Sequence, residues 1–359
     1  MNEIIFFGLN ENPKLIKNEP IKITKPIQFK FENENENENE KQIKQISSCE
    51  FSTIFLFKNG KAIEYLNENN SKQNPEKIQI EENIQKVTVG FSNEAILTIE
   101  GNIQNDRIIQ DIVSGYQSIY LLTSNQNVYG IGYNQFSQLG FDSDLLLKTE
   151  KPILMMKNVS KIFSGNYSFS VFLLNSNQEL FGCGSNYNGQ IGLGESRKEE
   201  TKIQKLTKIQ NIPKGKIIDI QCGSSHSIML IENENQNQNP KRKLYSCGNW
   251  QYNGLDVDTY EFTEIKSSLF KNENDNILDF SVGDSHTLIL TSNSKLIGFG
   301  LNNFSQLGTG DTNNQSIPIQ IELPKLRFNE NISIIIFLVN LKNHFFIILL
   351  LLFPILKKI

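Results

Sequence analysis

Residues 182–192 read GCGSNYNGQIG, and this arrangement of glycine, asparagine and glutamine returns at residues 130–140, GIGYNQFSQLG, and residues 298–308, GFGLNNFSQLG. In each copy the second glycine and the closing glycine are 8 residues apart, at 132 and 140, 184 and 192, and 300 and 308. A register kept this closely indicates a structural repeat.

Each copy follows a glycine and a short apolar run, such as Gly165 and Val171–Leu174 in the second copy. Apolar runs of about four residues bounded by glycine and asparagine are typical of buried strands and are too short for helices. A fourth copy is degenerate: it keeps Gly223, Gly248 and Gly254 but has Trp250 in the asparagine column.

The starting glycines lie at 115, 165, 223 and 283, so the periods are 50, 58 and 60 residues. Periods of this size are typical of a four-stranded propeller blade with loops of variable length. A helical solenoid would require apolar residues spaced by 3.6, and the chain shows no sustained stretch of that pattern.

Together these columns resemble the regulator of chromosome condensation repeat family, and the clear match runs from Asp111 to Leu323. The pairs His226-Ser227 and His286-Thr287 after the starting glycines also resemble that family. The resemblance implies an all-β fold, a seven-bladed β-propeller.

Earlier in the chain the repeats are degenerate. Only 25 residues separate Gly90 from Gly115, which indicates a blade that has lost most of its second half. The first residues, from Ile4 to Asn10, resemble the second half of a repeat with its glycine-x-asparagine turn. We therefore predict that Ile4–Phe7 pairs with strands near Ile317–Phe337, so that N- and C-terminal strands share one blade and close the propeller. The predicted propeller domain covers residues 1–331.

A hydrophobic tail, residues 332–359, follows this domain. It contains the apolar run Ile332–Val339 and twelve apolar residues from Phe345 to Leu356. Twelve residues are too few for a membrane span, which needs about 20. Three interpretations stay open: a membrane anchor made of both runs as a transmembrane helix, the first strand of the last blade at Ile332–Val339, and an erroneous reading of the true carboxyl terminus.

Composition restricts the class of partner. The chain has 35 basic and 39 acidic residues and a net charge of −4, so it has no general attraction for nucleic acid, and no nucleic-acid partner is predicted. The four cysteines, Cys49, Cys183, Cys222 and Cys247, have no spacing typical of zinc sites or disulfide frameworks. The N-terminal residues do not form a secretory signal, so a cytoplasmic location is predicted.

The chain shows no candidate catalytic, cofactor-binding or metal-binding residues. His226 and His286 occupy the same repeat column, which favours a repeated structural role such as bonding a neighbouring backbone carbonyl. With His344 in the tail, the histidines do not have metal-ligand spacing. The paired glycines occur in a repeat and are not followed by a helix, so they do not indicate a dinucleotide site. We predict no enzyme activity and no cofactor.

Propellers present loops on two faces, and a fold alone does not determine function. Without site chemistry, the sequence predicts a scaffold for protein–protein interaction. The family resemblance implies an alternative, guanine-nucleotide exchange on a small GTPase, although the matching columns are structural and include no exchange residue. The predicted partner is therefore a protein, with a small GTPase as one candidate, and membrane contact through residues 332–359 depends on the tail.

Overall fold

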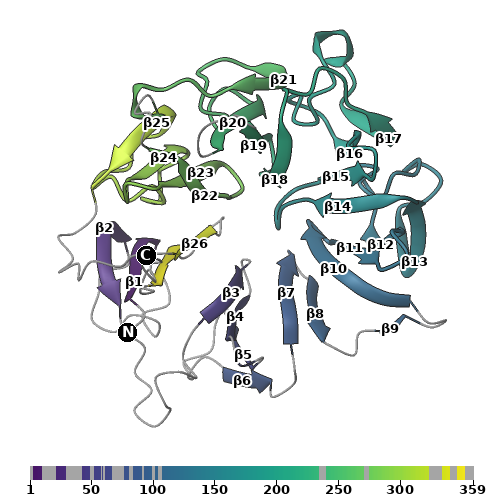
Figure 1. The fold of residues 1–359 in the computed structure, drawn as a ribbon, viewed down its shortest axis with the longest axis horizontal. Helices are drawn as coiled ribbons and strands as arrows, with labels where there is room; N and C mark the ends of the chain where they lie inside the picture. The colour runs from purple at the N-terminus through teal and green to yellow at the C-terminus, as the bar shows by residue number, and fades with distance from the viewer. Residues whose placement is uncertain are drawn as a thin grey trace.

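The computed structural model describes residues 3–9, 22–29, 43–48, 52–57, 59, 61–66, 77–80, 84–90, 93–98, 102–103, 107–233, 240–270, 275–322, 334–339 and 346–351. The described strands form separate antiparallel sheets that radiate from a common centre (Figure 1). The chain is therefore an all-β propeller, as the repeats predict.

The clear repeats form blades in chain order. Three of these sheets have four strands, and the sheet before them has β10 to β13 with the short strand β9 at its edge. The strands are β9 (Asn102–Ile103), β10 (Arg107–Gly115), β11 (Ser118–Thr123), β12 (Val128–Tyr133), β13 (Lys148–Met156), β14 (Val159–Phe163), β15 (Ser170–Asn175), β16 (Leu180–Ser185), β17 (Lys202–Lys208), β18 (Lys216–Cys222), β19 (His226–Asn233), β20 (Lys241–Gly248), β21 (Thr259–Glu264), β22 (Ile277–Val282), β23 (His286–Thr291), β24 (Leu296–Gly300) and β25 (Gln315–Ile321). Two short 3-10 helices, η1 (Glu195–Arg197) and η2 (Ser268–Phe270), lie in loops.

The N-terminal third forms smaller or less regular sheets. One contains β3 (Ile43–Ser48), β4 (Ser52–Phe57), β5 (Ala62–Leu66) and β6 (Lys77–Ile80). Another contains only two described strands, β7 (Ile84–Gly90) and β8 (Asn93–Thr98), which agrees with the short interval between Gly90 and Gly115. Because this sheet has two strands rather than four, the count of seven blades stays a prediction.

The two ends of the chain share one sheet, so the predicted closure is confirmed. Its strand order is β2 (Lys22–Phe29), β1 (Glu3–Leu9), β27 (Phe346–Leu351) and β26 (Ile334–Val339). The partner predicted for Ile4–Phe7 was placed too early, because β1 pairs directly with β27, with Ile5 opposite Ile348. The strand β25 completes the preceding blade, and the hairpin β26–β27 then supplies the strands that meet β1.

One strand of each sheet lies toward the centre of the molecule. These strands contact one another in sequence, from β3 through β7, β10, β14, β18 and β22 to β26, and β26 contacts β3 again (Figure 1). The strand β26 is therefore the strand of the closing sheet that lies toward the centre, in agreement with the interpretation of this apolar run as a blade strand. Among the described residues, no helix is long and apolar enough to cross a membrane.

The core lies between the blades. Every residue of β15 is buried, and alternate side chains pack against opposite neighbours. Val171 and Leu173 pack with Tyr120 of the preceding blade, whereas Phe172 and Leu174 pack with Met229 of the next. A strand covered on both sides is apolar throughout rather than alternating, which explains the continuous apolar run in each repeat.

The second glycine of each turn is required by geometry. Gly184 has φ +111°, and a Cβ placed there would lie 2.1 Å from the Phe169 carbonyl oxygen. The same carbonyl accepts a hydrogen bond from the Ser185 amide at 3.0 Å, so the close approach is part of the fold. Gly300 repeats this arrangement with the Ser285 carbonyl at 2.4 Å. Only glycine combines this φ with such a contact.

We expect Gly184→Ala to lower the free energy of unfolding by about 3 kcal/mol, through backbone strain and the clash with Phe169. Gly194→Ala is the matched control, because Gly194 has φ +93° but no neighbouring atom within 4 Å of the position that a Cβ would take. This control should cost about 1 kcal/mol. Equal losses for both variants in chemical denaturation would contradict the role assigned to the Phe169 carbonyl.

A second prediction concerns ring closure. Because β1 lies between β2 and β27, Ile5→Pro removes an amide donor from a central strand. We expect a loss of about 3 kcal/mol or more in chemical denaturation. Ile5→Val keeps the donor and is the control, with a cost of about 1 kcal/mol. If the proline variant is as stable as the valine variant, β1 does not close the propeller.

Candidate functional site

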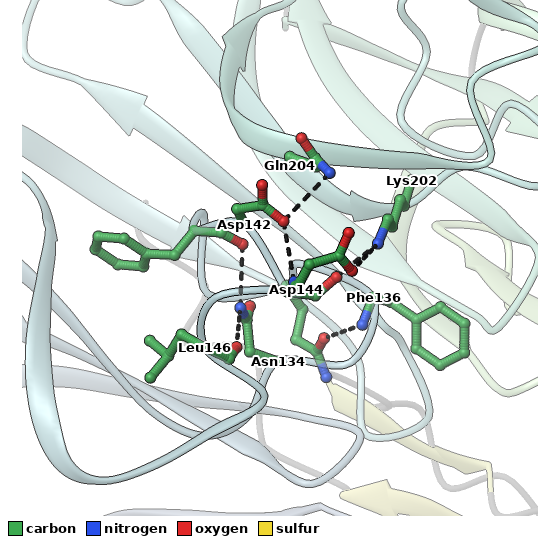
Figure 2. Close-up of polar contacts among 10 residues, drawn as sticks. Asn134, Phe136, Asp142, Asp144, Leu146, Lys202 and Gln204 are labelled. Atoms are coloured by element: carbon green, nitrogen blue, oxygen red, sulfur yellow. Dashed lines mark hydrogen bonds and ion pairs between the residues drawn. The ribbon is translucent and has the colours of Figure 1, made fainter.

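The buried asparagine of each turn organises the loop that follows the third strand. Asn134 accepts a hydrogen bond from the Leu139 amide at 2.8 Å and donates to the carbonyls of Phe141 at 3.0 Å and Leu146 at 2.7 Å (Figure 2). Asn186 and Asn302 have equivalent amide donors in Ile191 and Leu307. One side chain thus satisfies several backbone groups and holds the loop in a single shape.

In the degenerate copy the same task falls to a residue that sequence reasoning missed. Asn253 is fully buried and donates to the carbonyls of Gly248 at 2.9 Å and Val257 at 2.7 Å. It also accepts from the Leu255 amide at 2.9 Å. Trp250, in the asparagine column, is 41% exposed instead. The sequence signal for this replacement is an asparagine three residues after Trp250, the position where the other copies have theirs.

Gln190, in the glutamine column, joins its blade to the next. The side-chain Nε2 of Gln190 donates to the Ser224 backbone carbonyl at 3.0 Å. The backbone carbonyl of Gln190 accepts a hydrogen bond from the Ser227 hydroxyl at 2.7 Å. Both partners belong to the following blade. The loops on this face are therefore fixed relative to each other.

Further from the centre, side chains tie two loops together across a blade boundary. Lys202 donates to Ser143 at 2.7 Å and pairs with Asp144 at 3.2 Å, and Gln204 donates to Asp142 at 3.3 Å (Figure 2). These residues come from the loop after β12 and from β17. Exposed ion pairs contribute little individually, but here they act together with the buried asparagine and glutamine bonds.

Aromatic side chains lie along this ordered face. The ring of Phe169 is 4.4 Å from that of Tyr116 and 4.4 Å from that of Phe136, and Phe136 is 6.4 Å from Tyr187. In the next loop, Asn249 donates to the side chain of Asn188 at 3.3 Å, so the loop that carries Trp250 is bonded to the loop that carries Tyr187. We call Tyr116, Phe136, Phe169, Tyr187 and Trp250 the aromatic strip.

The sequence contained a signal for part of the strip. The fourth residue after the second glycine is aromatic in three of the four copies, at Phe136, Tyr252 and Phe304. This column was overlooked because the turn glycines and asparagines dominate the repeat. The arrangement of the blades determines that aromatic side chains from successive loops meet at one face.

The centre of the propeller holds a second polar feature, a cavity of about 460 Å³ lined by the first strands of several blades. Lys86 pairs with Asp111 across it, and Lys161 donates to the Ile218 carbonyl at 3.1 Å. In each strand a β-bulge directly precedes the charged residue, which is Lys86, Asp111 or Lys161. Bulges re-aim side chains, and here those side chains link adjacent blades.

One carboxyl group of β22, that of Asp279, has an unusual pKa. Burial raises the pKa of Asp279 to about 7, while the Phe280 amide and Arg242 act in the opposite direction. The Phe280 amide donates to this carboxylate at 2.9 Å. Nearby Asp219 adds to the raised pKa by like-charge repulsion. In the part of the chain that the structure describes, no group of three or more His, Cys, Asp or Glu side chains is placed to hold a metal.

The two repeated histidines are structural. His226 and His286 are fully buried. His226 Nε2 lies 3.2 Å from the Thr287 hydroxyl of the next blade. The partner of His226 is thus a hydroxyl of the next blade rather than the neighbouring backbone carbonyl that the repeat column suggested. Burial lowers the pKa of His226 to about 3 and also holds that of His286 well below its ordinary value.

The described cysteines are also part of the core. Cys183, Cys222 and Cys247 are free and buried. Burial raises their pKa values, to about 12 for Cys222, so the reactive thiolate is disfavoured. The sulfur of Cys247 donates to the Gln190 carbonyl at 3.3 Å. Cys183 and Cys247 directly precede the turn glycines Gly184 and Gly248, and Cys49 lies outside the described residues.

Family comparison agrees with this geometry. The model for the regulator of chromosome condensation (RCC1) repeat matches residues 177–230 and 293–333, and a second model of that repeat matches residues 277–306. Residues 177–230 and 277–333 thus consist of RCC1 repeats. The matched segments contain two of the turns described above, those of Asn186 and Gln190 and of Asn302 and Gln306.

Curated relatives share the repeats within much longer proteins. The human probable E3 ubiquitin-protein ligase HERC4 is 25% identical over 237 residues, which is 64% of this chain and 21% of that protein. The BTB/POZ domain-containing protein 1 of Schizosaccharomyces pombe is 24% identical over 229 residues, 60% of this chain and 16% of that protein. The chain thus spans about a fifth of the length of these relatives.

Solved structures show the same architecture over the full propeller. Human WBSCR16 has a TM-score of 0.74 at 15% identity and covers 98% of this chain and 99% of its own. Prp20p from Saccharomyces cerevisiae has a TM-score of 0.73 at 18% identity, with 99% of this chain and 92% of that chain covered. At these identities the likeness shows the fold alone.

The buried histidines predict acid sensitivity. Folding lowers the pKa of both histidines. At a pH below the ordinary histidine pKa of about 6.5, the unfolded chain therefore binds more protons than the folded chain. Stability is therefore complete above that pH and falls as the pH drops toward the folded-state value of about 3 for His226. We expect His226→Gln to reduce the slope of the free energy of unfolding between pH 6 and 4 by about 1.4 kcal/mol per pH unit.

The control for this measurement is Thr287→Val, which removes the hydroxyl beside His226 but leaves the imidazole buried. Its free energy of unfolding should fall at every pH, while the slope stays that of the parent. Chemical denaturation across the pH range gives both quantities. A parental slope in the His226→Gln variant would show that His226 does not titrate on unfolding.

Proposed function

We propose that this chain is a non-enzymatic β-propeller scaffold that binds a protein partner through the face carrying the aromatic strip. The observation that carries the proposal is the exposure of large aromatic side chains on loops held rigid by buried hydrogen bonds. Tyr187 is 61% exposed although the neighbouring Asn186 is buried. Interfaces are enriched in tyrosine and tryptophan, and a pre-ordered loop loses little entropy on binding.

Burial of the chemically reactive side chains supports a non-enzymatic role. The described cysteines have raised pKa values and the repeated histidines have lowered ones, each because of burial. Their repeated positions match structural columns rather than one site. The ligase activity named for the relatives forms no part of the proposal, because this chain covers only 21% of HERC4.

Guanine-nucleotide exchange on a small GTPase is the second candidate. It is favoured by the fold shared with Prp20p, whose structure was described with its binding properties to Gsp1p and histones. A propeller face that binds a GTPase without releasing its nucleotide would still be a scaffold. The two candidates therefore differ in the rate of nucleotide release rather than in binding.

Two measurements test the proposal. The full chain, immobilised as bait, should retain a defined protein partner from a lysate of its source cells after washing at physiological salt. The same protein, at concentrations well below those of the GTPases, should leave the release of labelled GDP from a panel of small GTPases unchanged. Accelerated release would replace the scaffold by the exchange-factor candidate, and failure to retain any partner would contradict both.

A further inference from the structure

The loops around the aromatic strip carry more acidic than basic side chains. Loops 133–148, 186–202 and 249–259 contain seven acidic and four basic residues, and the seven acids are Asp142, Asp144, Glu195, Glu199, Glu200, Asp256 and Asp258. The strip therefore lies in a locally negative field. Fields of this kind attract cationic ligands and raise their association rate.

Each basic residue of these loops is already engaged. Arg197 pairs with Glu200, Lys198 with Glu195 at 2.7 Å and Lys202 with Asp144 at 3.2 Å. Lys148 lies 5.4 Å from the centre of the Tyr133 ring and pairs with Glu150 at 3.5 Å. The positive charges on this face are thus neutralised locally.

Acidic groups on the same loops lack such neutralisation. In the described part of the chain, no ion pair involves Glu199, Asp256 or Asp258, and all three are exposed. Asp258 accepts a hydrogen bond from the backbone amide of Trp250 at 2.8 Å, so this carboxylate is held on the same loop segment as an exposed indole. An aromatic face next to a carboxylate is a suitable environment for a guanidinium or ammonium group.

We propose that the aromatic strip and the carboxylates of Glu199, Asp256 and Asp258 form a docking surface for a protein segment rich in arginine or lysine. This inference rests on the scaffold function and specifies the chemistry of its partner. Cationic side chains would stack on Tyr187 and Trp250, while the carboxylates neutralise their charge. The negative field disfavours nucleic acid on this face, because phosphates would be repelled.

The test is fluorescence anisotropy of the full chain with a labelled peptide of alternating arginine and glycine. A peptide of the same length with glutamate in place of arginine is the charge control. We expect the arginine peptide to bind with an affinity that falls as salt rises, and the glutamate peptide to show no binding.

Variants separate this surface from the rest of the protein. Tyr187→Ala combined with Trp250→Ala should weaken binding of the arginine peptide by about 10-fold or more, since stacked aromatics act as interface anchors. Glu199→Gln with Asp256→Asn should weaken it by about 3-fold and reduce the salt dependence. The change to asparagine suits the φ of +60° at residue 256. The side chain of Ile317 on β25 is 53% exposed, so Ile317→Ala is the matched apolar control. This variant should bind the arginine peptide like the parent.

Several outcomes would overturn the inference. The first is equal binding of both peptides, and the second is parental affinity in the aromatic double variant. The third is a concentration-dependent dimer of the parent that the aromatic double variant does not form, because this would assign the strip to a second copy of the chain. The proposed function is judged separately by retention of a partner on the bait. If the aromatic double variant retains the partner like the parent, the scaffold stands and this docking surface is wrong.

Discussion

The close approach of one carbonyl oxygen to a glycine is the constraint on which each blade depends. At Gly184 the Phe169 carbonyl occupies the space that a Cβ would need, and the backbone has a positive φ. This contact joins the start of the second strand to the end of the third, where the chain leaves the sheet. From that point Asn186 accepts the Ile191 amide, and Gln190 reaches the next blade. Strand ends, loop shape and blade-to-blade contact thus follow from a single turn.

Packing between blades gives the ring its cohesion. The second strands are apolar on both faces, since alternate residues such as Phe172 and Val171 pack against opposite neighbours. Loss of part of one blade can be tolerated because each sheet buries its faces mainly against adjacent sheets. The two-stranded sheet of β7 and β8 illustrates this, as β10 contacts it directly.

The polar groups near the axis and those on the loop face have different roles. Near the axis, charged side chains link blades, as Lys86 and Asp111 do. On the face, by contrast, the carboxylates of Glu199 and Asp256 remain exposed on the loops that carry Tyr187 and Trp250. The charged side chains near the axis already bond to neighbouring blades, so few of their hydrogen-bonding groups remain for a ligand. The exposed carboxylates on the loop face can still bind a partner. This contrast places the candidate interface on the loops.

The sequence by itself determined the all-β propeller class, the repeat register, the shortened blade before Gly115 and the closure by strands from both ends. These features are local or periodic: a glycine with positive φ, a buried asparagine and a four-residue apolar run have the same requirements in every copy. Tertiary structure alone decided which strand meets β1, that Asn253 replaces the asparagine missing at Trp250, and that Tyr116, Phe136, Phe169 and Tyr187 form one strip. Each of these depends on residues from different loops or blades, and their distances are set by how the sheets are placed around the axis, which no local pattern encodes.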